Sequence, residues 1–183
     1  IGDSSRVINS SVTKNGMLGI SAGDNCTIEG NEVSANQSTI ISGVQTGVSC
    51  SIIGNAVFDH IGVGIDAGQD SVVKSNVARQ NRVGIVCRGG GCLIGGNAAS
   101  NNNAGGISAQ NGSTVSNNVA NENTSISGSG FGIFAGLGSI VIGNTARSNE
   151  GFGLTVSGSS SPVGYAKNVF TDNNGSNGNP QVN

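Results

Sequence analysis

The chain has 183 residues and a formal net charge of −2, with 32 Gly, 25 Asn and no Trp. This charge gives no basic footprint for nucleic acid, and no apolar run approaches the roughly 20 residues that a membrane-spanning helix needs. We therefore expect neither a nucleic-acid partner nor a membrane span. Because 35% of the residues are hydrophobic and recur regularly, the chain has enough apolar surface to fold rather than stay disordered.

Apolar residues recur in three columns at intervals of about 22 residues, which is a repeat length typical of solenoids. These columns predict three short strands in each repeat, because helices would need longer apolar segments. We expect the third column to point inward in one line, and we expect loops at the insertions 43–48 and 123–130. In chain order the first column holds Ile28, Ile52, Val72, Ile94, Thr114 and Val141, the second holds Val12, Val33, Val57, Val77, Ala99, Val119, Ala146 and Val169, and the third holds Ile20, Ile41, Ile65, Ile85, Ile107, Ile133 and Leu154.

Turn-forming residues separate these strands. Asn tolerates left-handed backbone and suits a tight corner, and one set of equivalent corners carries Asn15, Asn36, His60, Gln80, Asn102, Glu122 and Asn149. Gly residues that directly precede the third column, such as Gly64 and Gly84, are expected to leave a flat stripe on the outer surface. Three strands and three corners per repeat predict an all-β, single-stranded parallel β-helix of about 7–8 coils of roughly 22 residues, with equivalent strands pairing in parallel.

A family resemblance is carried by the unit TIEGNEVSANQSTIIS and its echoes SIIGNAVFDHIGVGID and IVIGNTARSNEGFGLTV. These segments resemble the right-handed parallel β-helix repeats of pectate-lyase-like proteins, NosD-type periplasmic proteins and mannuronan epimerases. The closing segment VGYAKNVFTDNNGSNGNPQVN is similar to the end of secreted bacterial β-helix proteins. The resemblance implies one right-handed β-helix domain over residues 1–183 in a secreted or cell-surface protein. Since the chain starts within a repeat, we expect an N-terminal cap to be missing, and residues 170–183 to form an irregular tail.

Asp66 is the candidate that the resemblance brings forward. Gly64, Ile65 and Asp66 match the start of the mannuronan epimerase motif, but Ala67 and Gly68 replace its Pro-His pair, which removes the implied acid–base histidine. A glycosidase needs two carboxyl groups at controlled separation. The outward residues after the third column hold one acid, in the order Ser21, Ser42, Asp66, Val86, Ser108, Phe134 and Thr155.

These residues favour binding over catalysis. We expect Asp66 to be solvated or loosely paired with Arg88 or Arg82, and we name Ser42, Asp66, Arg82 and Arg88 as candidate ligand-binding residues. His60 is expected to fill a corner place that Asn takes in other turns. No catalytic residue is assigned, and we expect no cofactor and no metal, because one His and scattered Cys do not supply the four ligands of a zinc site.

The four cysteines offer two disulfides. Cys26 and Cys50 fall at equivalent places in adjacent turns, and a short loop joins Cys87 to Cys92. Both pairs meet the spacing that a disulfide requires, and an even count in an exported chain favours bridges. Stacked free thiols are the alternative.

Two functions are consistent with this sequence. The first is a secreted structural or binding module whose flat polar faces contact glycans, or other copies of the chain through the solenoid ends. The second is a lyase or uronate epimerase that acts on an acidic polysaccharide. Sparse charge and the lack of an aligned acid–base pair favour the first, so the sequence leans away from an enzyme without deciding the question.

Overall fold

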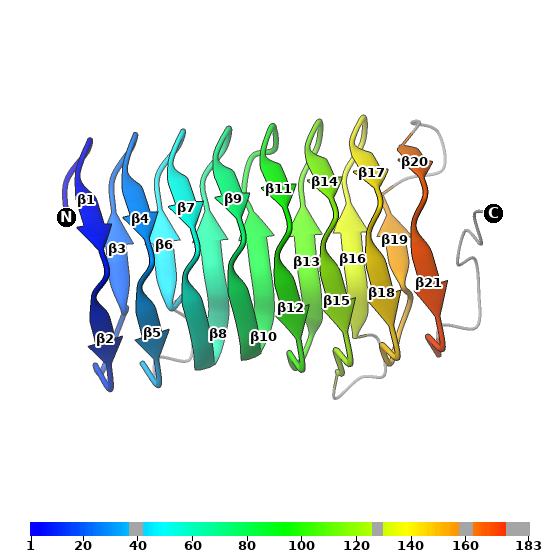
Figure 1. Cartoon of the computed structure of the whole chain (residues 1–183), viewed down its shortest axis with the longest axis horizontal. Coiled ribbons are helices and arrows are strands. Elements are labelled where there is room, and N and C mark those ends of the chain that lie inside the picture. The colour runs from blue at the N-terminus through cyan, green and yellow to red at the C-terminus, as the bar shows by residue number, and fades with distance from the viewer. Residues whose placement is uncertain (37–41, 126–129, 158–162, 175–183) are drawn as a thin grey trace.

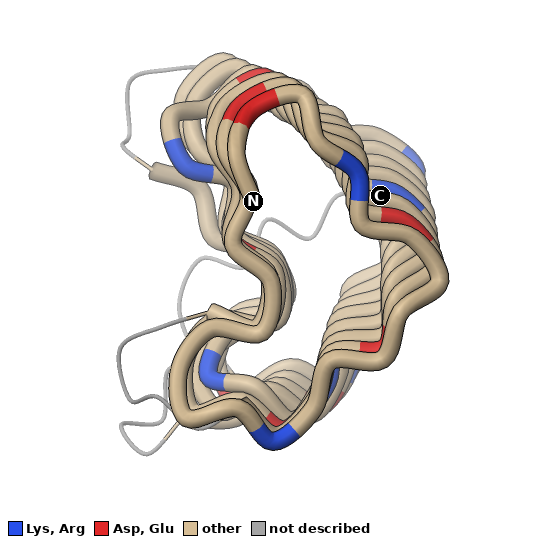
Figure 2. Tube along the Cα trace, turned by 90° about the vertical axis from the view of Figure 1, so that its left-hand side faces the viewer, with Lys and Arg blue, Asp and Glu red and all other residues tan. Residues whose placement is uncertain are grey.

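The computed structural model describes residues 1–36, 42–125, 130–157 and 163–174. Within these ranges every regular element is a β-strand, and neighbouring strands pair in parallel, as at Ile28 and Ile52. Figure 1 shows the strands stacked side by side along one axis, and Figure 2, which looks along that axis, shows successive turns superposed on one outline. The predicted all-β parallel solenoid is therefore confirmed.

One face of the solenoid is an eight-stranded sheet with one strand from each turn. Its central column is apolar, and Ile28, Ile52 and Ile94 are each at most 1% exposed. In stacking order the strands are β1 (Arg6–Ile8), β4 (Thr27–Glu29), β7 (Ser51–Ile53), β9 (Val72–Lys74), β11 (Leu93–Gly95), β14 (Thr114–Ser116), β17 (Ile140–Ile142) and β20 (Gly164–Ala166).

The other strands form a 13-stranded sheet that bends around a corner. In two central turns the bend lies within one long strand, β8 (Ala56–Ala67) or β10 (Val77–Cys87). Elsewhere it separates two short strands. Before the corner these are β2 (Ser11–Thr13), β5 (Glu32–Ser34), β12 (Ala98–Ser100), β15 (Val119–Asn121), β18 (Thr145–Arg147) and β21 (Val169–Thr171), and after it they are β3 (Ile20–Ala22), β6 (Val44–Thr46), β13 (Gly105–Ala109), β16 (Phe131–Ala135) and β19 (Leu154–Val156).

The solenoid has about seven turns, and its period is read from hydrogen bonds between equivalent residues. Most of these bonds join residues 21 apart, as between Asn55 and Asn76, and three turns are longer, with separations of 24, 26 and 24. The expected loop at 43–48 is wrong, since β6 covers Val44–Thr46. The segment 126–129 of the other expected insertion lies outside the described residues.

The inward columns differ from the prediction by one residue in several turns. Val77, Val119 and Val169 are 42%, 39% and 52% exposed, whereas Ala78 and Ala120 occupy the buried column. The sequence analysis followed the larger apolar residue, but a shift of one residue moves a strand side chain to the other face. For the same reason Val73, Val115 and Phe170 take the inward places that were given to Val72, Thr114 and Val169.

In the third column Ile20, Ile65, Ile85, Ile107, Ile133 and Leu154 are buried as expected. Ile41 lies outside the described residues, and Val44 pairs with both Ile20 and Ile65 in its turn. β21 also continues the solenoid into the predicted tail, and residues 175–183 are not described.

Two ladders of buried Asn side chains line the interior at two corners. At most steps the side-chain oxygen of one Asn accepts from the backbone N–H and the amide group of the Asn one turn before, as Asn97 does from Asn76 at 2.9 and 3.0 Å. The same Asn97 amide group donates to the oxygens of Val73 and Asn118. One ladder runs through Asn31, Asn55, Asn76, Asn97, Asn118, Asn144 and Asn168, and the other through Asn15, Asn36, His60, Asn81, Asn102, Asn123, Asn149 and Asn173.

The ladder residues are not the left-handed corner residues that the sequence suggested. Gln80 and Glu122, which were placed among the corner residues, carry the positive φ, and Asn81 and Asn123 directly after them point inward into the ladder. The glycines before the third column also have another role than the flat outer stripe. A Cβ on Gly84 would lie 2.8 Å from the oxygen of Gly106 and 2.9 Å from the amide nitrogen of Asn102, so this Gly lets the ladder approach the backbone.

Candidate functional site

Asp66 lies near the end of β8 in a column that faces out of the strand, where it pairs in register with Gln45 and Val86. Its side chain is nevertheless only 2% exposed. The Ser42 hydroxyl donates to Oδ2 at 3.2 Å, and Nε of Arg88 donates to Oδ1 at 2.5 Å. The carboxylate is thus charge-paired and hydrogen-bonded, as buried charges must be.

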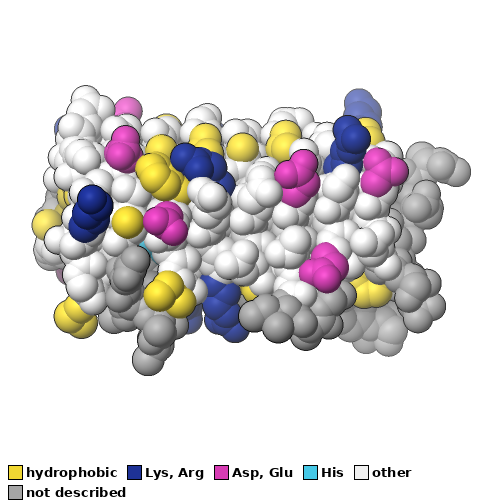
Figure 3. Space-filling model, turned by 90° about the horizontal axis from the view of Figure 1, so that it is seen from below, with side chains coloured by type: hydrophobic (Ala, Val, Ile, Leu, Met, Phe, Trp, Pro, Cys, Tyr) yellow, Lys and Arg dark blue, Asp and Glu magenta, His cyan; other side chains and the backbone are white. Residues whose placement is uncertain are grey.

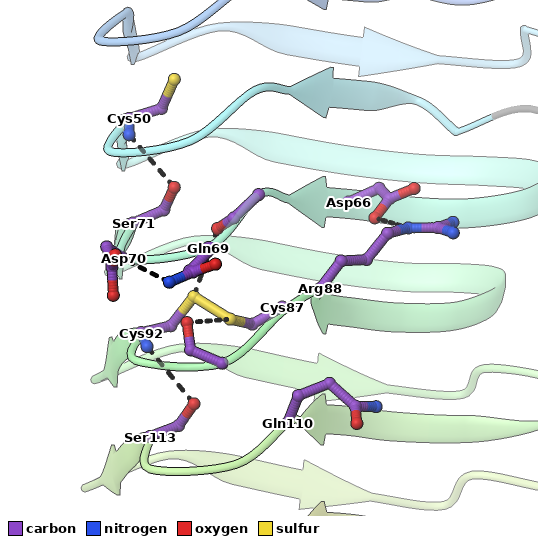
Figure 4. Close-up of a disulfide and its surroundings, with 12 residues drawn as sticks. Cys50, Asp66, Gln69, Asp70, Ser71, Cys87, Arg88, Cys92, Gln110 and Ser113 are labelled. Atoms are coloured by element: carbon purple, nitrogen blue, oxygen red, sulfur yellow. Dashed lines mark hydrogen bonds and ion pairs between the residues drawn. A yellow bond between two sulfur atoms is a disulfide. The ribbon is translucent and has the colours of Figure 1, made fainter.

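Arg88 directly follows β10, and its backbone N–H donates to the oxygen of Ala67 at 2.8 Å. Its side chain is 65% exposed, and the hydrogen bond to Asp66 raises the pKa of the guanidinium further above its ordinary value. Figure 4 shows the side chain reaching across from its own turn to that of Asp66. The bond to Asp66 uses Nε. The two terminal nitrogens of the guanidinium make no hydrogen bond to other described residues.

A pocket of about 340 Å³ opens beside this pair and is lined by Arg88, Gly89, Gln110 and Asn111. Gln110 is the register equivalent of Arg88 one turn later, because Cys87 pairs with Ala109. The sequence analysis missed Gln110 and Asn111, and the 22-residue step from Ile85 to Ile107 was the signal that would have found them. The pocket therefore presents one cation and two amide side chains, which can bind a carboxylate or hydroxyl groups.

The structure brings together three of the four candidate residues. Ser42, Asp66 and Arg88 are in direct contact, whereas Arg82 lies exposed within β10 and makes no ion pair with any described residue. Of the alternatives expected for Asp66, the structure shows the pairing with Arg88, not the pairing with Arg82 or a solvated carboxylate. Ser42 reaches Asp66 although Gln45 holds the equivalent place in the strand column.

The site lacks a hydrogen-bonded acid–base pair among the described residues. His60 is 3% exposed and fills an Asn place in the second ladder, as expected, with Nδ1 3.1 Å from the oxygen of Asn36 and Nε2 3.1 Å from the oxygen of Val33. Its ring is therefore engaged inside the solenoid. The chemistry that Asp66 and Arg88 offer is the fixing of a positive charge at the surface.

A second pocket, of about 490 Å³, is lined by Lys14, Asn15, Gly16, Ala35 and Asp59. It holds one cation and one anion, and neither forms an ion pair with another described residue. Figure 3 shows charged side chains of both signs scattered over the face seen from below, with hydrophobic side chains between some of them. This surface offers hydrogen bonds more than concentrated charge.

The third corner carries a ladder of Cys and Ser side chains. The backbone N–H of each residue donates to the sulfur or hydroxyl of the equivalent residue one turn later: Cys26 to Cys50 at 3.2 Å, Cys50 to Ser71 at 3.1 Å, Cys92 to Ser113 at 3.3 Å, and Ser113 to Ser139 at 3.2 Å. Figure 4 shows Cys50, Ser71, Cys92 and Ser113 in line along this corner. Serine and cysteine thus serve the same hydrogen-bonding place.

The cysteines fall into two different states. Cys87 and Cys92 form a disulfide, with Cα atoms 6.4 Å apart, which joins the end of β10 to the corner ladder. Cys26 and Cys50 are free and buried, so the bridge expected between them is not formed. Burial raises the pKa of the Cys50 thiol above its ordinary value.

Sequence and fold comparisons place this solenoid among known proteins. The NosD family, described as periplasmic copper-binding protein, matches residues 2–181. No curated protein sequence matches the chain significantly. The fold is similar to that of a mutant form of the periplasmic alginate epimerase AlgG, with a TM-score of 0.66 and 18% identity over 82% of this chain. The chain spans 37% of that enzyme, and at this identity the likeness shows the fold alone.

The described residues contain no helix long and apolar enough to cross a membrane. The family match extends over nearly the whole length, from the first complete turn to the last residues of the chain. We conclude that this chain belongs to the NosD family of periplasmic β-helix proteins.

Proposed function

We propose that the chain is an extracytoplasmic module that binds acidic polysaccharide, with Arg88 as its anchoring residue. One observation carries this proposal: buried Asp66 holds Arg88 by Nε and leaves the rest of an exposed guanidinium beside a pocket with Gln110 and Asn111. A fixed guanidinium can bind the carboxylate of a uronate, because its planar donors match carboxylate geometry. The amide side chains suit neighbouring sugar hydroxyls.

The long axis of the solenoid supports a polymeric ligand. Equivalent side chains repeat at each turn about 4.8 Å apart, and the outward column beside Asp66 continues through Val86 and Ser108. An extended chain along this face would make many weak polar contacts, and Arg88 would add one charged contact. The family's periplasmic designation supports a location where such polymers occur.

The test measures the affinity of the protein for a uronate polymer and for a neutral polymer of similar length. Calorimetry at low and at high salt gives both affinities. Arg88→Ala is expected to weaken uronate binding about tenfold or more, in keeping with the loss of a charge-assisted hydrogen bond. Arg82→Ala is the matched control, because it removes the same charge from an exposed residue of β10, the strand that Arg88 follows. Equal losses in both variants would contradict a specific site at Arg88.

A lyase or uronate epimerase is the second candidate. It is favoured by the place of Asp66 on a strand face of a fold that is similar to that of an alginate epimerase. Catalysis would need a second titrating group that reaches the same sugar. Formation of unsaturated uronate, or a change of uronate configuration observed by NMR, tests this candidate directly.

Association of copies through the outermost strands of the solenoid stays a prediction.

The family description names copper, so the described residues were compared with known copper ligands. No group of three or more His, Cys, Asp or Glu side chains is placed to hold a metal within the described ranges. His60 does not fit an imidazole site, since both ring nitrogens face backbone oxygens. Cys26 and Cys50 are free thiols, the soft donor type that copper(I) prefers, but each sulfur donates to a backbone oxygen, of Gly2 at 3.2 Å and of Gly23 at 3.3 Å.

A further inference from the structure

Two phenylalanine side chains, Phe131 and Phe134, stand on the outer face of β16 and take no part in the core. The buried columns of the solenoid are filled by aliphatic and cysteine side chains, and the core includes neither ring. Both residues are half-buried, and their ring centroids lie 6.3 Å apart at 61°, in edge-to-face contact. The chain has five Phe and no Trp, so two rings in contact on the surface call for a reason other than filling the interior.

The Phe131 ring lies flat against the sheet. It covers Gly105, its strand partner in the preceding turn, at a place where Val63 and Val83 stand in earlier turns. A Cβ on Gly105 would meet Cζ of the ring and would lie 2.5 and 2.6 Å from Cε1 and Cε2. Because the three carbons are at similar distances from that point, the point lies over the face of the ring and not at its edge. The opposite face is therefore turned away from the backbone, and Phe134 stands at an angle beside it.

The two rings share a face of the solenoid with the Arg88 pocket. Phe134 follows Val86 and Ser108 in one outward column. Asp66 stands in the same column one turn before Val86, and it holds the Arg88 guanidinium. The charge and the ring are thus three turns apart, or about 14 Å at about 4.8 Å per turn. A polymer that lies along the solenoid axis from Arg88 therefore passes over Ser108 and reaches the rings.

We infer that Phe131 and Phe134 form an aromatic platform, which binds the C–H face of a pyranose ring in a polysaccharide with equatorial linkages. In a β-1,4-linked glucose or glucuronate chain, the faces of each sugar ring present axial C–H groups. The partial positive charge of these groups is attracted by the negative face of an aromatic ring. A chain with axial linkages is buckled and does not lie flat on the platform. The inference rests on the proposed binding of polysaccharide and adds the shape of the sugar that the site selects.

The test titrates the whole chain with three oligomers of equal length. They are a β-1,4-linked glucuronate, a neutral β-1,4-linked glucose oligomer, and an α-1,4-linked galacturonate, whose linkages are axial. NMR gives the affinity for each oligomer and shows whether the signals of the Phe rings move. The glucuronate is expected to bind most tightly, because it meets both the platform and Arg88. The ring signals of Phe131 and Phe134 are expected to move with both β-linked oligomers and to stay in place with the galacturonate.

Phe134→Ala is expected to weaken the binding of both β-linked oligomers about fivefold, in keeping with the strength of an aromatic contact. The loss should be the same at low and high salt, because the contact carries no charge, and galacturonate binding should not change. Phe134→Tyr keeps the ring and is expected to bind as the parent does. Phe58→Ala is the matched control, because it removes a half-buried outward ring that the Arg79 guanidinium already covers, 4.4 Å from the ring centroid. Thermal melts verify that each variant is folded.

The inference is overturned if Phe134→Ala binds the neutral oligomer as tightly as the parent, or if the parent binds neither β-linked oligomer. It is also overturned if the parent sediments as a dimer that Phe134→Ala dissociates, because the platform would then be a contact between copies. Failure of the proposed uronate site gives a different result. The glucuronate would then bind no more tightly than the neutral oligomer, Arg88→Ala would change neither affinity, and the loss in Phe134→Ala would still support the platform.

Discussion

Nε of Arg88 lies 2.5 Å from Oδ1 of Asp66, and the two side chains differ in exposure, at 65% for the arginine and 2% for the aspartate. The aspartate therefore acts as a buried support for a surface cation. Asp66→Asn is expected to lower the free energy of unfolding by about 1–2 kcal/mol, because it removes a charge-assisted hydrogen bond whose other partner stays solvated. It should also weaken uronate binding, although Asp66 itself is covered.

Urea denaturation and calorimetry on the same variant check both effects. Arg88→Lys is the matched comparison, since it keeps the charge and loses the planar donor set. Unchanged uronate affinity in Asp66→Asn would mean that Arg88 needs no support to bind. Loss of binding in Asp66→Asn with full binding in Arg88→Ala would instead assign the contact to the carboxylate.

His60 stands in a ladder whose neighbouring members, Asn36 and Asn81, are amides. His60→Asn is expected to keep the free energy of unfolding within about 1 kcal/mol, because Asn restores the ladder's own hydrogen bonds. His60→Ala is expected to cost about 1–3 kcal/mol, since it leaves a buried backbone oxygen and a cavity. Thermal melts of the two variants decide the matter, and equal losses would show that the ring is held by packing rather than by its place in the ladder.

Gly84 is predicted to tolerate no side chain. An added Cβ would lie 2.8 Å from the oxygen of Gly106, 2.9 Å from Nδ2 of Asn102 and 3.0 Å from Cβ of Ala99. Gly84→Ala should therefore destabilise the protein by about 1–3 kcal/mol through overpacking. Gly16→Ala is the control, because nothing lies within 4 Å of its Cβ position. A melting temperature of Gly84→Ala that matches the control would refute the close approach.

Much of the fold could be predicted from the sequence, because the repeat places one apolar strand residue per turn and the turn residues mark the corners. The one-residue errors at Val77 and Val119 arose where a strand has apolar residues on both faces, so that alternation does not identify the inner one. The Asn ladders could have corrected them. A ladder member must point inward, and Asn81 and Asn123 fix the register that Gln80 and Glu122 obscured.

The candidate site could be predicted in part. Its members were found because register brings Asp66 and the residue after Cys87 into adjacent turns. The burial of Asp66 could not be found, since it depends on how Ser42 and Arg88 lie over an outward-facing carboxylate. Outward direction and exposure are different properties, and a repeat pattern reports the first. Likewise, spacing allowed a Cys26–Cys50 bridge but did not require it.

Placing a charge on the inward face of a strand should destabilise the protein, whereas a charge on its outward face should not. Ile107 is fully buried in β13, and Ser108 beside it faces outward. Ile107→Asp is expected to prevent folding, since a charge in the narrow core finds no partner. Ser108→Asp is expected to change the free energy of unfolding by less than about 0.5 kcal/mol. Soluble yield and thermal melts measure both, and similar behaviour of the two variants would contradict the assigned directions.

Because the pKa of Cys50 is raised, we expect the free energy of unfolding to fall as the pH rises. Burial holds the folded-state pKa above the ordinary value of 9.0, so the unfolded chain loses this proton first as the pH rises. The stabilising contribution is therefore fully present below about pH 8 and is lost as the pH rises through 9 towards the folded-state pKa. Serine at position 50 cannot ionise, so Cys50→Ser should lack this slope. Urea denaturation at pH 7.0 and pH 9.5 measures the difference, and parallel declines in the parent and in Cys50→Ser would show that the thiol does not contribute.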